Sequence, residues 1–550
     1  MTFPFRPAFL LLILTLTAQP VLAQTPKASE PEAPRQVVEY GITLEQNREW
    51  IKAIQHYEAV VREYPEDQTL RRRLLISRLH YDVIRRLTDQ SLADISTSEP
   101  VSNALNLYSE VLARLEMSYV DPIDLTEVIR GGTAYLEVAL TEPGFLNEHL
   151  PNVDRRQVED FRTAIHKVTL SRPILNRYDA RAVVTEAAER AERSIGMDAT
   201  TTVVQFTLGA IGLLDPYSSF LSSEELTEVE SQIEGNFVGL GIALEPHEVP
   251  LHILNVIPGG PAEEMGIVAG DRIVQIGNIT CQDVGADRAA DLLRGPPNSN
   301  LRLLIASEEY GQRDLVISRR RVEVPSIEDV QILKPETGLA YLKISSFQKT
   351  TVSEIDRALW DLHQSGMKSL IIDVRGNPGG WLDASIAVAD RFLPKGRIVS
   401  TRGKNGIENQ NYDATLSGTW DMPLTLLIDK DSASASEILA GAIRDNRRGE
   451  IIGETTYGKG SVQGLFHTKL LSSGIRLTVS KFYSPNGQAI SERGVKPTFA
   501  IDPDSQPRYV AKVPTSGRSS QKLEEDYVLQ VAIERSSKRN VAAQRGFPRN

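Results

Sequence analysis

Three serines alternate with alanines at the start of an expected helix, and the middle one could act as a nucleophile. Residues 424–428 form a short apolar run that predicts a buried strand, and a helical pattern begins just after Ser432, Ser434 and Ser436. A hydroxyl at a helix N-terminus lies beside free backbone N–H groups, which stabilise negative charge. Serine is also a preferred helix cap, but one cap needs only one serine. The pattern therefore indicates a nucleophilic serine whose oxyanion is stabilised by its own helix.

A lysine could supply the base that such a serine needs. The chain has eight histidines, and the nearest one downstream is His467. Lys459 lies closer, flanked by glycines, with Gln463 four residues later. Lysine accepts a proton only when neutral, so its pKa of about 10.4 must fall by roughly 3 units, which burial can cause. We expect Lys459 to be buried and Gln463 to hold its amine by a side-chain hydrogen bond.

The same residues also fit two other chemistries less well. Residues 453–459 match the phosphate-binding pattern G-x-x-x-x-G-K, but Gly460 replaces the Ser or Thr that would hold magnesium. Residues 462–471 then show no helical pattern that could receive a phosphate. A histidine-based hydrolase would need His467 to reach Ser434, which lies in no G-x-S-x-G motif. We therefore expect neither a nucleotide site nor a serine–histidine pair.

Three motifs together resemble those of the carboxyl-terminal processing peptidases, tail-specific serine proteases with a Ser–Lys dyad. In chain order the motifs are IIDVRGNPGGWL at 371–382, SASASEI at 432–438 and GKGSVQ at 458–463. The resemblance extends from about residue 215 to about residue 503. It implies that Ser434 is the nucleophile, that Lys459 is the base and that Gln463 is its partner.

The resemblance also assigns roles around the dyad. The glycine loop after the apolar run 369–374 would contribute the backbone N–H of Gly379 or Gly380, together with that of Ala435, to an oxyanion hole. An aspartate sometimes counted with the dyad corresponds to Asp445. An ionised carboxylate beside the lysine would keep the lysine protonated, so we favour a structural role at the helix end for this aspartate. The resemblance implies no metal ion and no organic cofactor.

The segment 234–321 resembles a PDZ domain, which binds the C-terminal tails of other proteins. The residues that resemble its carboxylate-binding loop are Gly239, Leu240, Gly241 and Ile242. Glycines in such a loop free backbone N–H groups to form an anion nest, and the strand that follows offers an edge to an extended peptide. Arg294, at the end of an expected helix, could couple tail binding to the active site. The implied partners are unfolded or tail-exposed proteins with apolar last residues.

Charge and the N-terminal residues predict an exported protein. The net charge of −11 argues against nucleic acid as a partner, and the single cysteine, Cys281, permits no intramolecular disulfide. Residues 1–23 resemble a secretory signal whose apolar core, about ten residues, is too short to span a bilayer. An uncleaved signal anchor is the alternative. We expect the protein in the periplasm or on the extracytoplasmic face of the membrane, which it would touch only peripherally or through such an anchor.

We expect a multidomain α/β protein with a ClpP/crotonase-like α/β protease core, an inserted PDZ domain and an N-terminal all-α region. The expected segments are a linker at 24–37, a tetratricopeptide-like helical hairpin at 38–90, helices at 100–233, the PDZ domain at 234–321 and the core at 322–504. The last segment, 505–550, is expected to contain a C-terminal helix at 523–535 followed by a disordered tail. The hairpin fits one tetratricopeptide repeat and a plain amphipathic hairpin equally well, because no second copy follows at the expected period. Its surface could hold an adaptor protein or a second subunit.

These patterns predict an exported serine endopeptidase that recognises protein C-terminal tails. The alternative is a catalytically inactive scaffold that binds protein C-termini through its tetratricopeptide-like and PDZ segments. Ser434, Lys459 and Gln463 argue against the scaffold, because a protein without catalysis has no use for a buried lysine.

Overall fold

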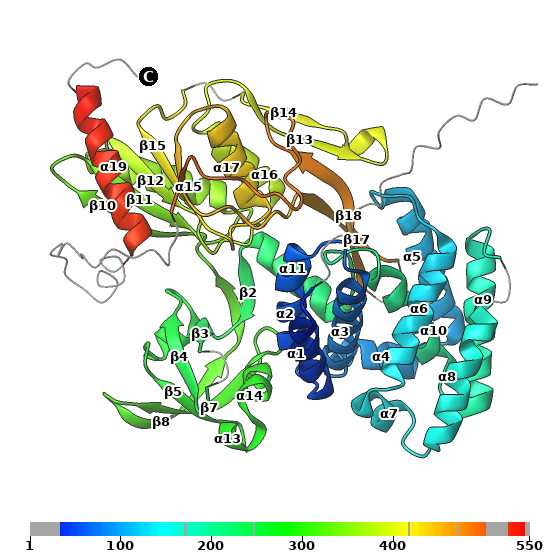
Figure 1. Ribbon diagram of the computed structural model, residues 1–550. Helices are drawn as coiled ribbons and strands as arrows, with labels where there is room; N and C mark the ends of the chain where they lie inside the picture. Colours follow the sequence, from blue (N-terminus) through cyan, green and yellow to red (C-terminus); the bar gives the residue numbers. More distant parts are fainter. Residues whose placement is uncertain are drawn as a thin grey trace, which may run out of the picture. The chain divides into compact units, whose positions relative to one another are not determined.

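A computed structural model describes residues 33–169, 173–245, 248–415, 418–469, 472–501 and 526–544 (Figure 1). The expected signal at 1–23 and most of the expected linker lie outside these residues. The chain divides into two units, residues 1–82 and 83–550, and each is described by itself.

The first unit contains a helical hairpin. It consists of α1 (Arg35–Gln46), α2 (Trp50–Glu63) and the first part of α3 (Gln68–Arg86), which continues into the second unit. The hairpin closes tightly because residue 41 is glycine: a Cβ there would lie 2.4 Å from the ring of Tyr57. The buried residues of this small core are Leu44, Ala53, Tyr57, Val60, Leu70 and Leu74.

The second unit begins with a bundle of helices. They are α4 (Gln90–Ser98), α5 (Val101–Ser118), α6 (Leu125–Ala139), α7 (Pro143–His149), α8 (Arg155–Thr169), α9 (Arg177–Ile195) and α10 (Ala199–Gly212). α10 is buried on every side and lies against α5, α6 and α9. Its backbone approaches α6 closely, since a Cβ at Gly209 would lie 2.6 Å from the Gly131 carbonyl. Of the described helices, none is long and apolar enough to cross a bilayer.

A smaller β domain follows α11 (Ser223–Glu234). Its strands are β3 (Ile242–Leu244), β4 (Leu251–Val256), β5 (Arg272–Ile276), β6 (Ile279–Thr280), β7 (Asn300–Ser307) and β8 (Gly311–Ser318), and its helices are α12 (Pro261–Glu264), α13 (Cys281–Val284) and α14 (Ala286–Leu293). The strand order β3-β4-β5-β7-β8 leaves β3 at an edge of the sheet. A separate two-stranded ribbon, β2 (Asn236–Gly239) with β9 (Arg320–Glu323), carries the chain into and out of this domain.

The core is a mostly parallel sheet with both faces covered. Its strands, in the order β10-β11-β12-β15-β16-β19, are β10 (Ile327–Lys334), β11 (Leu339–Ile344), β12 (Ser369–Asp373), β15 (Leu424–Ile428), β16 (Glu450–Gly453) and β19 (Phe499–Ala500). Alternate residues of β11 face opposite sides, so Leu342 packs in one buried cluster and Tyr341 in the other. The first cluster includes residues of α15 (Thr351–Gln364), α16 (Leu382–Asp390) and α17 (Ala435–Asp445).

The opposite face is covered by the C-terminal helix α19 (Tyr527–Gln544), drawn in red in Figure 1. The sequence placed this helix at 523–535 with a disordered tail after it, but the helix continues to Gln544. It extends because Ser536, beyond the expected end, is buried and hydrogen-bonds Thr425 on β15 at 3.0 Å. Packing against the core sheet therefore stabilises the helical structure of residues beyond 535, whose composition alone predicts disorder.

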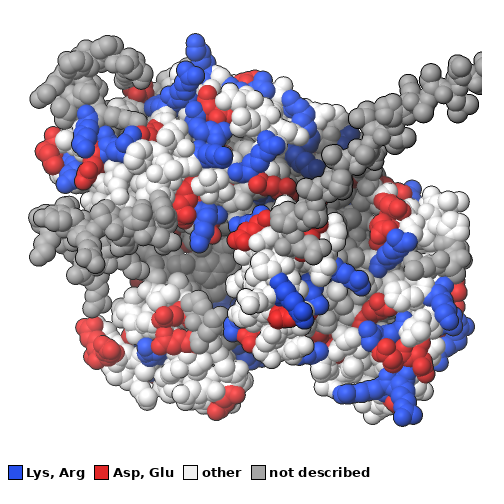
Figure 2. Space-filling model, viewed as in Figure 1, with Lys and Arg blue, Asp and Glu red and all other residues white. Residues whose placement is uncertain are grey.

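A second, antiparallel sheet lies beside the core. It contains β1 (Ser219–Leu221), β13 (Arg397–Gly403), β14 (Asn411–Asp413), β17 (Ser461–His467) and β18 (Gly474–Tyr483), with a 3₁₀ turn, η1 (Gly406–Glu408), between β13 and β14. On the face that Figure 2 draws, Lys and Arg are interspersed with Asp and Glu across the helical segments.

Candidate active site

Loops after three neighbouring parallel strands meet at one edge of the core sheet. β12 is followed by residues 374–380, β15 by residues 429–434 and β16 by residues 454–460. Ligand sites in such sheets lie beyond the carboxyl ends of the strands, where these loops meet. The fold therefore gathers the glycine loop, the serine triplet and the lysine that the sequence analysis selected.

Ser434 differs from the serines on either side of it. Ser432 and Ser436 are fully buried, and their hydroxyls donate to the carbonyls of Val374 at 2.8 Å and Asn377 at 3.0 Å. Ser434 is only half-buried, at the N-cap of α17, with φ +54° and ψ −110°. This backbone conformation is strained for a residue with a side chain, by about 1–3 kcal/mol, and such strain is concentrated at functional sites. The outer serines thus hold the turn, and the middle one presents its hydroxyl.

The glycine loop packs directly on the serine turn. A Cβ at Gly379 would lie 2.7 Å from Ser434 Cβ, and one at Gly380 would lie 2.0 Å from the Phe347 carbonyl oxygen. Asn377 joins the two segments, because its carbonyl accepts the N–H of Ala433 at 3.0 Å. Only glycine allows the loop backbone to approach Ser434 and Phe347 this closely, because it has no side chain.

Two backbone N–H groups beside Ser434 are available to an oxyanion. The sequence left Gly379 and Gly380 as alternatives, but the Gly379 N–H donates to Asn377 Oδ1 at 2.8 Å. Within the described part of the chain, neither the Gly380 N–H nor the Ala435 N–H has a hydrogen-bond acceptor. The Gly380 N–H points away from Phe347, whose backbone pairs with the residues on either side of Gly380. The N–H groups of Gly380 and Ala435 are therefore the candidate donors to an oxyanion.

Lys459 is largely buried and has an unusual environment. Its Nζ lies over the ring of Tyr217, 4.8 Å from the ring centroid. Burial lowers the pKa of the Lys459 ammonium to about 8, and the positive charge of Arg476 acts in the same direction. The carboxylates of Asp215 and Glu437 oppose these effects. In the described structure, no hydrogen bond joins Lys459 Nζ to the Ser434 hydroxyl.

Glu437 connects the serine turn to the lysine loop. Its side chain is fully buried, and its Oε2 accepts the backbone N–H groups of both Ser434 and Lys459 at 2.8 Å. Its Oε1 accepts the Thr456 hydroxyl at 2.6 Å and the Gly458 N–H at 2.7 Å. Burial raises the pKa of Glu437, while these four donors favour the ionised carboxylate. One side chain therefore sets the spacing of the two backbone segments that carry Ser434 and Lys459.

Replacing Glu437 with glutamine is expected to destabilise the fold and to lower activity. The amide nitrogen would face N–H donors, leaving about two of them unsatisfied at a cost of roughly 1–3 kcal/mol each. Urea unfolding measures the loss of stability, and peptide hydrolysis measures the loss of activity. Glu354→Gln is the control for the same substitution away from Ser434, because the donors at Ser326 and Ile327 all bind Glu354 Oε2, whose place an amide oxygen can take. Equal losses of activity in both variants would contradict the role of Glu437.

Gln463 does not contact Lys459 in this structure. Its Nε2 donates to Ser461 Oγ at 2.9 Å and to Thr478 Oγ1 at 3.4 Å. The hydroxyl of Thr478 donates in turn to Asp215, whose charge acts on Lys459. A register shift between β17 and β18 falls at Gln463 and sets the direction of its side chain. Gln463 therefore reaches the lysine environment through intermediates and not by the direct hydrogen bond that the sequence analysis expected.

Asp445 and Arg294 lie outside this cluster. Asp445 is at the other end of α17, about 16 Å of helix axis from Ser434, and binds the Arg444 guanidinium at 2.7 Å and the Asn486 N–H at 3.2 Å. A place for Asp445 beside the dyad is therefore wrong, because Asp445 is the last residue of α17 and Ser434 caps the first turn of the same helix. Arg294 is exposed just after α14 and makes no ion pair within the described residues. The buried arginine there is Arg319, which donates to the carbonyls of Leu292 and Leu293.

The expected tail-binding residues lie at one end of the β3 edge. Leu240 is buried, and Ile242 begins β3 opposite Val256 of β4. The carbonyls of Leu240 and Gly241 are engaged within the domain, but their N–H groups have no acceptor among the described residues. Free N–H groups next to an unpaired strand edge can bind a peptide carboxylate.

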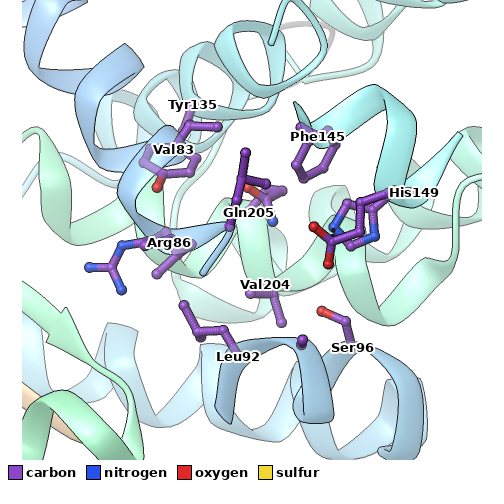
Figure 3. Close-up of a pocket in the computed structure, with 13 residues that line it drawn as sticks. Val83, Arg86, Leu92, Ser96, Tyr135, Phe145, His149, Val204 and Gln205 are labelled. Atoms are coloured by element: carbon purple, nitrogen blue, oxygen red, sulfur yellow. Dashed lines mark ion pairs between the residues drawn. The ribbon is translucent and has the colours of Figure 1, made fainter. Parts of the chain in front are cut away.

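Two other places carry clustered polar groups. Carboxylates of Glu245 and Glu248 and a ring nitrogen of His252 lie within 4.8 Å of one another in the β domain, where Arg272 also pairs with Glu248. A cavity of about 40 Å³ lies among helices of the bundle, with Gln205 directed into it and His149 at its side (Figure 3). It has room for only a few water molecules and contains none of the residues selected from the sequence.

Three residues of the site escaped the sequence analysis. Glu437 had a visible signal, since Ser-x-x-Glu is the spacing of a helix capping box. Tyr217 and Arg476 had none, because they reach Lys459 from distant segments. The structure also removes the phosphate-loop alternative, because residue 459 is followed by the strand β17 and not by a helix.

Comparisons with known proteins identify two segments of the chain. Residues 338–501 match peptidase family S41, and residues 252–307 match the PDZ domain. A carboxy-terminal-processing protease of Bartonella bacilliformis is 34% identical over 320 residues, which cover 56% of this chain and 72% of that protein. A carboxyl-terminal-processing protease of Synechocystis is 32% identical over 308 residues, which cover 55% and 71%. A solved photosystem II D1 C-terminal processing protease is similar at 24% identity and a TM-score of 0.38, covering 74% of this chain and 94% of that one.

Proposed function

Because the chain belongs to the carboxyl-terminal-processing proteases of peptidase family S41, we propose that it hydrolyses peptide bonds with Ser434 as nucleophile and Lys459 as general base. Membership makes it a serine-type peptidase, and its PDZ domain implies protein substrates. The observation that supports these two roles is the clamp of Glu437, which binds the backbone N–H groups of both residues.

The reaction follows from the groups around Ser434. Its Oγ attacks the scissile carbonyl carbon while neutral Lys459 takes the hydroxyl proton. The carbonyl oxygen becomes an oxyanion, stabilised by the N–H groups of Gly380 and Ala435, and one such donor is worth about 3–4 kcal/mol. The C–N bond then breaks as the lysine returns its proton to the leaving amine. A water molecule hydrolyses the acyl-enzyme with the same lysine as base.

The resting position of Lys459 suggests that the dyad is completed during substrate binding. Its Nζ lies over Tyr217 and is not hydrogen-bonded to Ser434. We expect a rotation of the flexible lysine side chain, on the backbone that Glu437 holds, to bring the amine to the hydroxyl. Catalytic hydrogen bonds are often long or absent until substrate is bound.

The PDZ domain is proposed to select substrates by their C-terminal tails. The free N–H groups of Leu240 and Gly241 bind the terminal carboxylate, and the tail adds to the edge strand β3. Gln463 supports the lysine through Thr478 and Asp215. We place the enzyme outside the cytoplasm, in the periplasm or on the outer face of the membrane, because of the apolar segment near its N-terminus.

One experiment tests both cleavage and tail selection. Purified protein is incubated with an unfolded model protein that ends either in apolar residues or in two aspartates, and mass spectrometry identifies the products. Cleavage of both, faster for the apolar tail, is expected. A lack of products from either substrate would favour the alternative, a catalytically inactive scaffold, if the protein still bound the substrate with the apolar tail. Equal rates of cleavage for the two tails would contradict tail selection by the PDZ domain, but not the proposed hydrolysis.

A further inference from the structure

The glycine loop is tied to the C-terminal helix through its first residue, Arg375. The guanidinium donates to Asp526 through Nη1 at 2.9 Å and through Nη2 at 2.6 Å. It also donates to Asp373 through Nε at 3.0 Å and through Nη2 at 2.6 Å. The Asp373 side chain is 3% exposed, and the side chains of Arg375 and Asp526 are about one-fifth exposed. Arg375 is therefore held between a carboxylate of the sheet and a carboxylate of α19.

Asp526 has two functions in the contacts of α19. It precedes the first residue of the helix, and its Oδ1 accepts the Leu529 N–H at 2.9 Å, as an N-cap does. Burial opposes its ionisation, but the hydrogen bonds and charge of Arg375 hold the pKa of Asp526 below its ordinary value. The lowered pKa favours the ionised carboxylate beside Arg375.

α19 is anchored to the sheet at its N-terminal end and near its middle. Its apolar residues Leu529, Ala532 and Ile533 pack in the buried cluster on the outer face of the core. At the far end of the strands, Arg535 pairs with Glu450, the first residue of β16, at 2.5 Å. Asp526 is thus the anchor at the catalytic edge, and Arg535 is the anchor at the opposite edge.

The contacts continue from Arg375 to the oxyanion donors. Five residues after Arg375 comes Gly380, whose N–H is free, and the loop between them is short. Asp429 accepts the Gly376 N–H at 3.0 Å, and Asn377 binds the serine turn. Asp373 and Asp526 therefore support the loop through Arg375, and Asp429 and Asn377 support it on the Ser434 side.

We propose that Asp526 is a positioning residue for catalysis, which acts through Arg375 to hold the glycine loop in the geometry that an oxyanion needs. This inference rests on the proposed function of the site. Asp526 lies outside the segment that matches peptidase family S41, which ends at residue 501. A displacement of about 1 Å at reacting groups can lower the rate 100-fold, so a loosened loop has a measurable effect without contact with substrate.

Two substitutions at Asp526 separate positioning from helix stability. Asp526→Asn keeps a good helix cap but removes the charge that Arg375 binds. Asp526→Glu keeps the charge but is a poorer cap. We expect kcat to fall by about 10- to 100-fold in Asp526→Asn and by no more than about threefold in Asp526→Glu. KM should change little in either variant. The reverse order would overturn the proposal, because it would show that the helix cap matters and the charge does not.

The affinity for a transition-state analogue is a second measurement, and it does not depend on the stability of the fold. A substrate-like peptide aldehyde forms a tetrahedral adduct with the serine and needs the oxyanion donors, whereas the same peptide with a free carboxylate does not. Aldehyde affinity is expected to fall with kcat in Asp526→Asn, while binding of the carboxylate peptide stays unchanged. Unchanged aldehyde affinity would overturn the proposal.

Arg535→Gln is the matched control on the same helix. It removes the ion pair with Glu450 and loosens α19 at the edge far from the glycine loop. Its melting temperature is expected to fall about as much as that of Asp526→Asn, with kcat and aldehyde affinity unchanged. Equal losses of kcat in the two variants would show that docking of the whole helix is responsible, and would overturn the proposal. Failure of the wild-type protein to cleave would instead refute the proposed function.

Discussion

The Ser434→Ala variant is expected to lose peptide hydrolysis by about 10⁴- to 10⁶-fold while keeping the wild-type melting temperature. Removal of the hydroxyl eliminates the acyl-enzyme route, and only the oxyanion donors and substrate binding remain. The folded state should not suffer, because the half-buried Ser434 side chain does not support the turn, whereas the buried hydroxyls of Ser432 and Ser436 do. Hydrolysis is measured with a fluorogenic peptide and with an unfolded protein.

Ser353→Ala is the control for this variant. Ser353 is an exposed serine in the first turn of α15, and its hydroxyl donates only to the Thr350 carbonyl at 2.8 Å. We expect full activity from this variant. If Ser434→Ala retained more than about one-hundredth of the wild-type rate in a preparation free of contaminating protease, the assignment of the nucleophile would be refuted.

Lys459→Ala is expected to lower kcat by about 10³-fold or more, because the serine loses its general base. Lys459→Arg should be equally inactive, although it keeps the charge and a cation above Tyr217, because arginine cannot lose its proton in a protein. Lys481→Ala, which removes a partly exposed lysine paired with Asp121, should retain activity. Activity in Lys459→Arg would show that the residue contributes charge and is not a base.

The pH dependence of the wild-type protein provides a separate measure of the same residue. The reactive form of Lys459 is the neutral amine, and its pKa is lowered to about 8. The neutral fraction, and with it kcat/KM, should rise about tenfold per pH unit below pH 8 and level off above about pH 9. Because kcat/KM reports the free enzyme, its midpoint corresponds to the lysine environment described here.

Arg476→Gln should move this profile to higher pH. The positive charge of Arg476 lowers the pKa of Lys459, so its removal raises that pKa and reduces the neutral fraction at pH 7. Activity at pH 7 should therefore fall, while activity at pH 10 should approach that of the wild-type protein. A profile that moves to lower pH, or a loss that is the same at every pH, would contradict the electrostatic role of Arg476.

Much of the site could be predicted because its parts are local in sequence. Ser434, the glycine loop and Lys459 each lie just after a short apolar strand, and parallel strands bring such loops together whatever the rest of the chain does. Small residues were also informative, since Gly379 and Gly380 are required by contacts shorter than any side chain permits. The helices α5 to α10 lie within the segment 100–233 where helices were expected, because their apolar periodicity is strong.

The features that the sequence did not predict depend on contacts between segments that are distant in the chain. Gln463 was expected to bind the lysine directly because it lies four residues away. Lys459 lies outside β17, however, and a register shift at Gln463 directs its side chain to Thr478. Asp445 was too far away because eleven residues of rigid helix separate it from Ser434. The C-terminal helix was expected to end at Arg535, yet it continues because the core sheet offers it a face to cover.

The sequence by itself determined that the chain carries a serine at a helix start, a glycine-flanked lysine and a loop able to pack closely, because residue type and local spacing decide these features. The tertiary structure alone decided how reactive these groups are. The lowered pKa of Lys459, the clamp of Glu437 and the support of Arg375 by Asp526 all arise from groups brought together across the chain. Burial and charge act through space, so no local pattern in the sequence could reveal them.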